Sequence, residues 1–174
     1  MDLLEVLRTR RSIRKYTQEP IGGDKVEKIL VSGLLSASSR GRRPWEFILV
    51  REKETLQKMS EARTGAAKML EGADCAVVVI VDADRTDVWT EDASIAMSNM
   101  LLMAHSLGVG GCWIQGRLRE ALDGSTTEQY LQSILEYPEN YRLEAILSLG
   151  MPAEKKKPYE IESLSWEKVH KERF

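Results

Sequence analysis

Basic side chains in three groups are the residues of this chain best suited to chemistry. The groups lie at residues 8–15, 40–43 and 155–157. Guanidinium groups at such density suit a phosphate or another anion, because the planar group can donate two parallel hydrogen bonds to it. A solvated basic surface would show the same spacing. The pattern alone therefore predicts either an anion-binding site or a charged surface.

Other catalytic schemes find few candidate residues. The chain has two histidines, His105 and His170, and no Cys-x-x-Cys motif, so a metal site of histidines or cysteines lacks ligands. We expect His105, within an apolar run, to be structural and His170, in a charged tail, to be solvated. Without a persuasive base, Ser-His-Asp catalysis has little support. Gly108–Gly111 precedes a predicted strand and does not match the dinucleotide-binding Gly-x-Gly-x-x-Gly pattern.

Length and composition predict one globular domain over residues 1–174. The formal charge of −2, with 43% apolar and 30% charged residues, leaves no basic surplus of the kind that nucleic-acid-binding proteins carry. The longest apolar run, Cys75–Val81, is far shorter than the roughly 20 residues of a membrane-spanning helix, and the acidic N-terminus shows no secretory signal. We therefore expect a cytoplasmic protein that binds neither nucleic acid nor membranes, with Cys75 and Cys112 as free, buried thiols.

Apolar periodicity predicts helices and strands that do not alternate strictly, which favours an α+β fold. Residues 75–81 are typical of a central strand buried on both faces. The helix predicted over residues 91–107, with Thr90 as its N-cap and Gly108 at its end, is apolar on most sides. One domain of this size can scarcely cover such a helix, so it indicates a partner subunit. The other predicted elements are helices at 3–7, 24–36, 54–63, 66–70 and 127–135, and strands at 47–50, 110–114 and 143–149.

Four motifs resemble the signatures of the nitroreductase superfamily, in the order in which that family has them. The first, Arg10–Tyr16, directly follows the N-terminal amphipathic helix. The second combines Ser38-Ser39 with Pro44-Trp45-Glu46-Phe47, the third is Gly111-Cys112-Trp113-Ile114, and the fourth is Leu149–Glu154 with the lysines that follow. Each motif alone is weak, but together they extend over nearly the whole chain.

The resemblance implies an α+β fold with a central mixed, mainly antiparallel sheet flanked by helices. It implies an intertwined homodimer that holds two FMN molecules at the subunit interface, with a C-terminal extension of about residues 150–174 packing on the partner subunit. FMN would carry electrons from NADH or NADPH to a small-molecule electron acceptor, such as a nitroaromatic or a quinone, in a ping-pong reaction. No catalytic side chain is assigned, because the cofactor carries the chemistry.

The resemblance also implies roles for individual residues. Arg10 would bind the FMN phosphate, joined by Lys156 or a neighbouring lysine. Arg14 would lie near flavin N1 and O2, where a fixed cation stabilises the negative charge of the reduced flavin. Backbone N–H groups at Gln115 and Gly116 would lie near flavin N5 and O4. The predicted cofactor-binding residues are Arg10, Arg11, Ser12 and Arg14 from one subunit, Ser38, Ser39, Arg40, Gly41 and Arg43 from the other, and Ile114, Gln115, Gly116, Lys155 and Lys156.

The serine loop departs from the family pattern at three positions. Ala37 stands where relatives often have Pro, Gly41 where they often have Asn, and Arg43 where they often have Gln. The added charge of Arg43 would recruit an anionic substrate or reach the FMN phosphate. The alternatives are a non-catalytic FMN-binding protein, a same-fold reductive dehalogenase or flavin-fragmenting enzyme, or an RNA- or DNA-binding surface.

Overall fold

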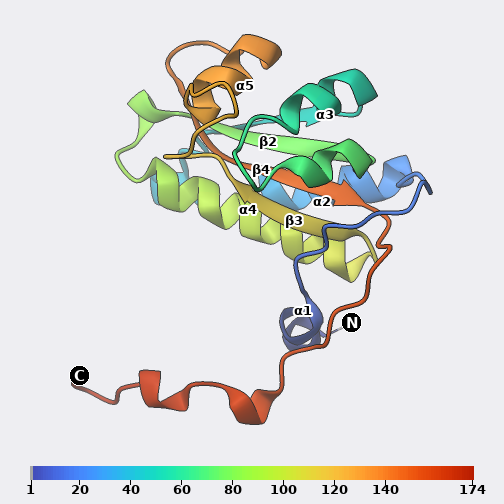
Figure 1. The fold of residues 1–174 in the computed structure, drawn as a ribbon. Helices are drawn as coiled ribbons and strands as arrows, with labels where there is room; N and C mark the ends of the chain where they lie inside the picture. Colours follow the sequence, from blue (N-terminus) through green and yellow to red (C-terminus); the bar gives the residue numbers. More distant parts are fainter. Residues whose placement is uncertain (1) are drawn as a thin grey trace.

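A four-stranded sheet with helices on both faces forms the body of the protein, in a computed structural model that describes residues 2–174 (Figure 1). The strands are β1 (Trp45–Val50), β2 (Cys75–Asp82), β3 (Gly110–Gln115) and β4 (Tyr141–Gly150). The α-helices are α1 (Leu3–Thr9), α2 (Gly23–Leu34), α3 (Lys53–Met59), α4 (Trp89–Ser106) and α5 (Thr127–Leu135). Short 3-10 turns lie at Ser39–Gly41, Lys68–Gly72, Ala83–Arg85, Ile161–Ser163 and Trp166–Lys168.

The strand order is β1-β2-β4-β3, and every neighbouring pair is antiparallel. This confirms the α+β fold with a mainly antiparallel sheet. Within residues 2–174 the sheet contains no parallel pair, so the mixed character expected of it is not found in one chain. Cys75–Val81 is buried throughout in the central strand β2, as its β-branched run predicted. Cys75 and Cys112 are free and buried, as expected.

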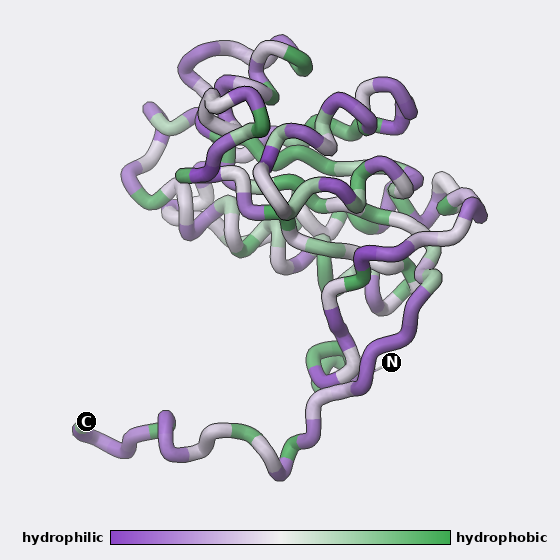
Figure 2. The backbone as a smooth tube through the Cα atoms, in the orientation of Figure 1, coloured by the Kyte–Doolittle hydropathy of each residue, from purple (hydrophilic) through white to green (hydrophobic). Residues whose placement is uncertain are grey.

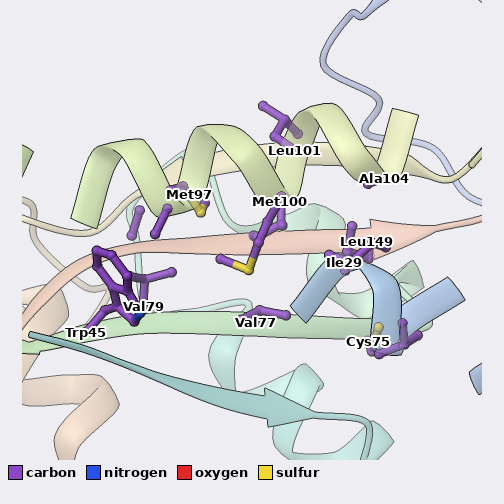
Figure 3. Packing of buried hydrophobic residues seen from close by; sticks show 14 of the residues in the cluster. Ile29, Trp45, Cys75, Val77, Val79, Met97, Met100, Leu101, Ala104 and Leu149 are labelled. Atoms are coloured by element: carbon purple, nitrogen blue, oxygen red, sulfur yellow. The ribbon is translucent and has the colours of Figure 1, made fainter. Parts of the chain in front are cut away.

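Alternating side chains of β2 divide the core into two layers. Val77 belongs to the layer under α2 and α4, whereas Val78 belongs to the layer under α3 and α5. In the first layer, Met97 and Met100 of α4 pack with Ile29 of α2 over the sheet (Figure 3). Both faces of β2 and β4 are therefore buried under helices, and β3 and α4 carry the candidate site residues at their ends.

The long helix α4 begins earlier than its sequence predicts and is only partly covered. Its N-cap is Val88, so Thr90 lies inside the first turn, and its prediction as the N-cap is wrong. The helix ends as expected, with Gly108 at a φ of +74° that glycine adopts readily. Ile95 remains 42% exposed. Part of the apolar surface of α4 is therefore left uncovered by its own chain.

After β4 the chain leaves the body and runs beside α1 (Figure 1). Tyr159 N–H donates to Arg8 O (3.0 Å), which joins the two segments. Every residue from 159 onward is exposed, and apolar residues are scattered through this polar segment (Figure 2). None of the helices in residues 2–174 is long and apolar enough to cross a membrane. The large apolar side chains exposed on α1 and this C-terminal arm are Leu3, Leu4, Leu7, Tyr159, Ile161, Leu164, Trp166, Val169 and Phe174.

Candidate functional site

The arginine segment, residues 10–16, lies along the edge of the sheet beside β3. Ile13 N–H donates to Gly111 O (3.0 Å). The Tyr16 phenol is largely buried under the segment, and this burial raises its pKa. A Cβ at Gly150 would lie 2.5 Å from the Tyr16 ring, so the segment can come this close only because position 150 is a glycine. Ile13 and Tyr16 thus fix the backbone that carries the arginines.

The side chains of this segment lie near different parts of the protein. Burial raises the pKa of the Cys112 thiol, and Arg14, Ser12 and Arg10 oppose that rise. Ser12 and Arg14 therefore lie beside Cys112, and the charge of Arg10 reaches both Cys112 and His105. Arg11 instead borders the hollow beside Lys155 and Lys156, so the arginines of the segment have different surroundings.

Arg11 contacts the C-terminal arm. Its Nη1 donates to Lys157 O, and its guanidinium carbon lies 4.5 Å from the centre of the Tyr159 ring. A stacked contact of this kind is worth about 0.5–1 kcal/mol at an exposed site. The structure thus gives Arg11 a role in joining the arginine segment to the arm.

Lys155 and Lys156 lie beside the same segment. Lys156 Nζ is 2.7 Å from Glu154 Oε2, and Arg14 N–H donates to Glu154 Oε1 (2.7 Å). The hydrogen bonds from Lys156 and from the Arg14 backbone hold the pKa of Glu154 below its ordinary value. A hollow of about 330 Å³ borders Arg11, Lys155 and Lys156. The first and fourth motifs therefore meet in space, as a set of donors suited to a phosphate.

The serine loop, residues 38–43, lies at the other end of α4. Ser39 N–H donates to Oδ1 of the buried Asp92 (2.8 Å), and Oδ2 of the same carboxylate has no partner in the described part of the chain. Arg40 and Arg43 adopt left-handed φ values of +53° and +46°, which are uncommon outside glycine. Asp92 therefore anchors a tightly folded loop that exposes its arginines.

In one chain the two predicted halves of the site are far apart. His105 Nε2 is 2.8 Å from Thr9 Oγ1, next to the arginine segment. The Thr9 hydroxyl donates to Glu5 O (2.6 Å), so His105 must donate to Thr9, which confirms a structural histidine. Asp92 and His105 are thirteen residues apart on α4, which is about 20 Å at 1.5 Å per residue. One chain by itself does not complete the predicted site.

The turn after β3 carries the third motif. Trp113 Nε1–H donates to Gln115 Oε1 (2.9 Å), and the Ile114 side chain is buried, which leaves only its backbone for a ligand. Gly116 N–H donates to Glu144 O (3.2 Å). The Gly116 N–H is therefore not free in this chain, in contrast to the role that the resemblance implied for it.

The sequence did not single out several charged residues near these elements, among them Glu144, Arg63 and Arg119. The Glu144 carboxyl is 2% exposed, accepts a hydrogen bond from Ser94 Oγ (3.1 Å), and has a pKa raised by burial. Burial also lowers the pKa of Arg63, and the nearby charge of Arg119 lowers it further. A single acid inside the apolar run of β4 is the signal that could have identified Glu144.

The donors are distributed along β3 in a way that suits an elongated anion. Arg10, Ser12 and Arg14 lie near its start, and Gln115, whose backbone N–H is expected near the flavin ring, lies at its end. Gly111 and Gln115 are four positions apart, which is about 13 Å in a strand. A phosphate at one end and a planar ring at the other match this set of donors. No group of three or more His, Cys, Asp or Glu in residues 2–174 is arranged to hold a metal ion.

A family model described as the nitroreductase family matches residues 7–67 and 57–151 of this chain. The chain belongs to the nitroreductase family. The matched ranges contain the arginine segment, the serine loop and the turn after β3. The resemblance that the four motifs carried is thereby confirmed.

Known relatives match the chain over almost its full length. A solved FMN-dependent nitroreductase from Clostridium difficile is 44% identical, with a TM-score of 0.95, covering 98% of this chain and 99% of that one. A protein of Archaeoglobus fulgidus assigned as an NADH dehydrogenase/NAD(P)H nitroreductase is 36% identical over 178 residues, 99% of each chain. One with the same assignment from Methanothermobacter thermautotrophicus is 36% identical over 158 residues, 88% of this chain and 79% of that protein.

Proposed function

We propose that this protein is an FMN-dependent NAD(P)H oxidoreductase that works as a homodimer. Membership of the nitroreductase family supports the reaction class, and the Clostridium difficile relative is itself FMN-dependent. The observation that carries the proposal is the division of the site. The donor set for a phosphate and the serine loop lie at opposite ends of α4, about 20 Å apart. A second copy can bring the two together.

The residues present fit FMN by the chemistry of their donors. Arg10, whose charge reaches both Cys112 and His105, would hold the phosphate through charge-assisted hydrogen bonds, joined by Lys155 or Lys156, which border the same hollow as His105. Arg14 would supply a fixed positive charge near the ring, in an orientation supported by its backbone bond to Glu154. When bound, FMN supplies the electron transfer between a nicotinamide and an acceptor. The protein's part is to bind, orient and exclude water.

The homodimer is supported by apolar surface that one chain leaves open. A groove of about 710 Å³ is lined mainly by apolar atoms of α1, α2 and α4, including Val31, Leu35 and Met103. The C-terminal arm exposes Trp166 to 66% and Val169 to 62%. Exposed apolar surfaces of this extent mark interfaces. We infer that the arm packs on the partner subunit.

The finer part of the proposal is a ping-pong reaction in which NADH or NADPH and then a nitroaromatic or quinone acceptor use the same face of the flavin. No side chain is assigned as a proton donor, which agrees with the structural role of His105. The cytoplasmic location and the absence of nucleic-acid and membrane partners stay predictions.

A flavin-reduction experiment tests this proposal. The purified protein should be yellow, or become so with FMN, and NADH or NADPH should bleach the colour without oxygen. A panel of nitroaromatics and quinones should then restore it. A chain that binds FMN but is not bleached by either nicotinamide would be a non-catalytic FMN-binding protein. A chain that stays colourless with FMN would overturn the proposal.

A further inference from the structure

A small pocket lies beside Gly116, at the end of β3 away from the arginine segment. Its volume is about 210 Å³. Pockets for drug-sized ligands occupy roughly 300–1,000 Å³, so this one suits a single ring or one anionic group of a larger ligand. We call it the Arg117 pocket; it is lined by Trp89, Gly116, Arg117, Arg119, Glu128 and Arg142, among others.

Positive charge dominates the Arg117 pocket. Its one carboxylate, Glu128, is bonded through both oxygens: Oε1 is 3.1 Å from Arg142 Nη2, and Oε2 accepts Leu143 N–H (2.7 Å). Within residues 2–174, neither Arg117 nor Arg119 forms an ion pair with a carboxylate. The pocket is therefore lined by two arginines that form no ion pair with a carboxylate in the described part of the chain.

Trp89 adds an aromatic wall to the pocket. The Arg117 guanidinium carbon lies 5.5 Å from the centre of a Trp89 ring, and a stacked guanidinium keeps N–H groups on its edge for a further partner. The Glu144 carboxyl is within electrostatic reach of Arg117, but it is buried and bonded to Ser94 Oγ. Glu91 adds a further negative charge in that neighbourhood. Neither Glu144 nor Glu91 forms an ion pair with Arg117.

We propose that the Arg117 pocket binds the carboxylate of an aromatic electron acceptor and thereby selects anionic acceptors over neutral ones. The proposal rests on the proposed function, because Gly116, which borders this pocket, directly follows Gln115, whose backbone N–H is expected at the edge of the flavin ring. The FMN phosphate is not the anion concerned. It would lie near Arg10, and the stretch Gly111–Gln115 alone spans about 13 Å.

Benzoate and benzamide test the pocket, because they differ in charge and hardly in shape. In calorimetric titrations of the FMN-loaded protein, benzoate should bind roughly tenfold or more tightly than benzamide. Arg117→Gln should abolish most of this preference. Arg51→Gln, which removes a guanidinium at the opposite end of the sheet, should retain it. Equal affinities in the wild type, or a preference that survives in Arg117→Gln, would overturn the proposal.

The nicotinamide dinucleotide also carries anionic phosphates, so kinetic measurements must show whether the Arg117 pocket binds the acceptor or the dinucleotide. Protein reduced in advance with dithionite should be reoxidised by para-nitrobenzoate roughly tenfold more slowly in Arg117→Gln, with para-nitrobenzamide nearly unaffected. Reduction by NADH should change little. If Arg117→Gln instead slows NADH and leaves benzoate binding intact, the pocket serves the nicotinamide and the proposal is wrong. Failure to take up FMN is a separate result, and the benzoate titration can still be performed on that FMN-free chain.

Discussion

Arg10 and Arg11 are neighbours in sequence, yet their side chains have different surroundings. Burial lowers the pKa of His105, and the charge of Arg10 lowers it further; the same charge opposes the rise in the pKa of Cys112. Arg11 is stacked on Tyr159 and bonded to the arm. The two residues therefore offer a matched pair of substitutions that remove the same charge from two different places.

Arg10→Ala should weaken FMN binding by roughly 10- to 100-fold, because a charge-assisted hydrogen bond to phosphate is worth about 1.5–3 kcal/mol. Arg11→Ala should change FMN affinity by less than about threefold and instead loosen the arm. Fluorescence titration with FMN measures both, at protein concentrations where the two variants sediment alike. An unchanged affinity in Arg10→Ala would contradict its assigned role.

The spacing of the arginines in the sequence identified the arginine segment, but it could not show that neighbouring arginines have different surroundings. That difference follows from the extended backbone, which Ile13 fixes against β3. The serine loop was also identified, whereas its anchor Asp92 was missed, because an acid at the start of a helix is usually interpreted as a favourable charge at the dipole. Arg117 was missed because a lone arginine after a strand has no distinguishing pattern.

At the scale of elements, hydrophobic periodicity predicted the order of helices and strands well. The burial of β2 on both faces and the end of α4 followed directly from residue type. The start of α4 did not, because Thr90 is a favoured cap by type while the backbone turns earlier, at Val88. Glu144 connects three elements in a way that periodicity cannot show. Its carboxyl accepts a hydrogen bond from Ser94 Oγ of α4, and its backbone carbonyl accepts hydrogen bonds from the N–H groups of Gly116 and Arg117.

Glu144→Gln should stabilise the protein in a pH-dependent way. Burial raises the pKa of Glu144, so the folded chain keeps a proton that the unfolded chain releases, and wild-type stability falls as the pH rises from the unfolded pKa through the folded one. The amide that replaces the carboxyl in this variant has no such proton to lose. Thermal unfolding should therefore show a larger gain in Tm at about pH 8 than at about pH 4. An equal Tm difference at both pH values would contradict this account of Glu144.

At the scale of the whole molecule, the protein exposes more apolar surface than a monomer needs. The groove over α1, α2 and α4 is open in one chain, and the arm exposes Ile161, Leu164, Trp166 and Val169. The sequence indicated a partner subunit through the apolar helix. The family resemblance added the C-terminal extension as a segment that packs on the partner, but the residue pattern alone could not, because the arm has no periodicity and its apolar residues are isolated.

Deletion of residues 159–174 should weaken the dimer, since it removes the exposed apolar side chains of the arm. Sedimentation should show the full chain at about twice 19.7 kDa and the shortened chain shifted toward the monomer at the same concentration. Because the arm contributes nothing buried to the core, the far-ultraviolet circular dichroism of the body should be retained. Trp166→Ala, a milder change, should have a smaller effect in the same direction. A shortened chain that dimerises as tightly as the full one would exclude the arm from the interface.

The most direct test of the central claim, an FMN site completed by two copies of the chain, is complementation between two defective chains. Arg10→Ala and the double variant Ser38→Ala/Ser39→Ala should each retain little FMN as homodimers. A heterodimer of the two, isolated with two different tags, unites both defects in one site and leaves the other intact. It should hold about one FMN that NADH or NADPH bleaches. A heterodimer with no more FMN than either homodimer would contradict the shared site.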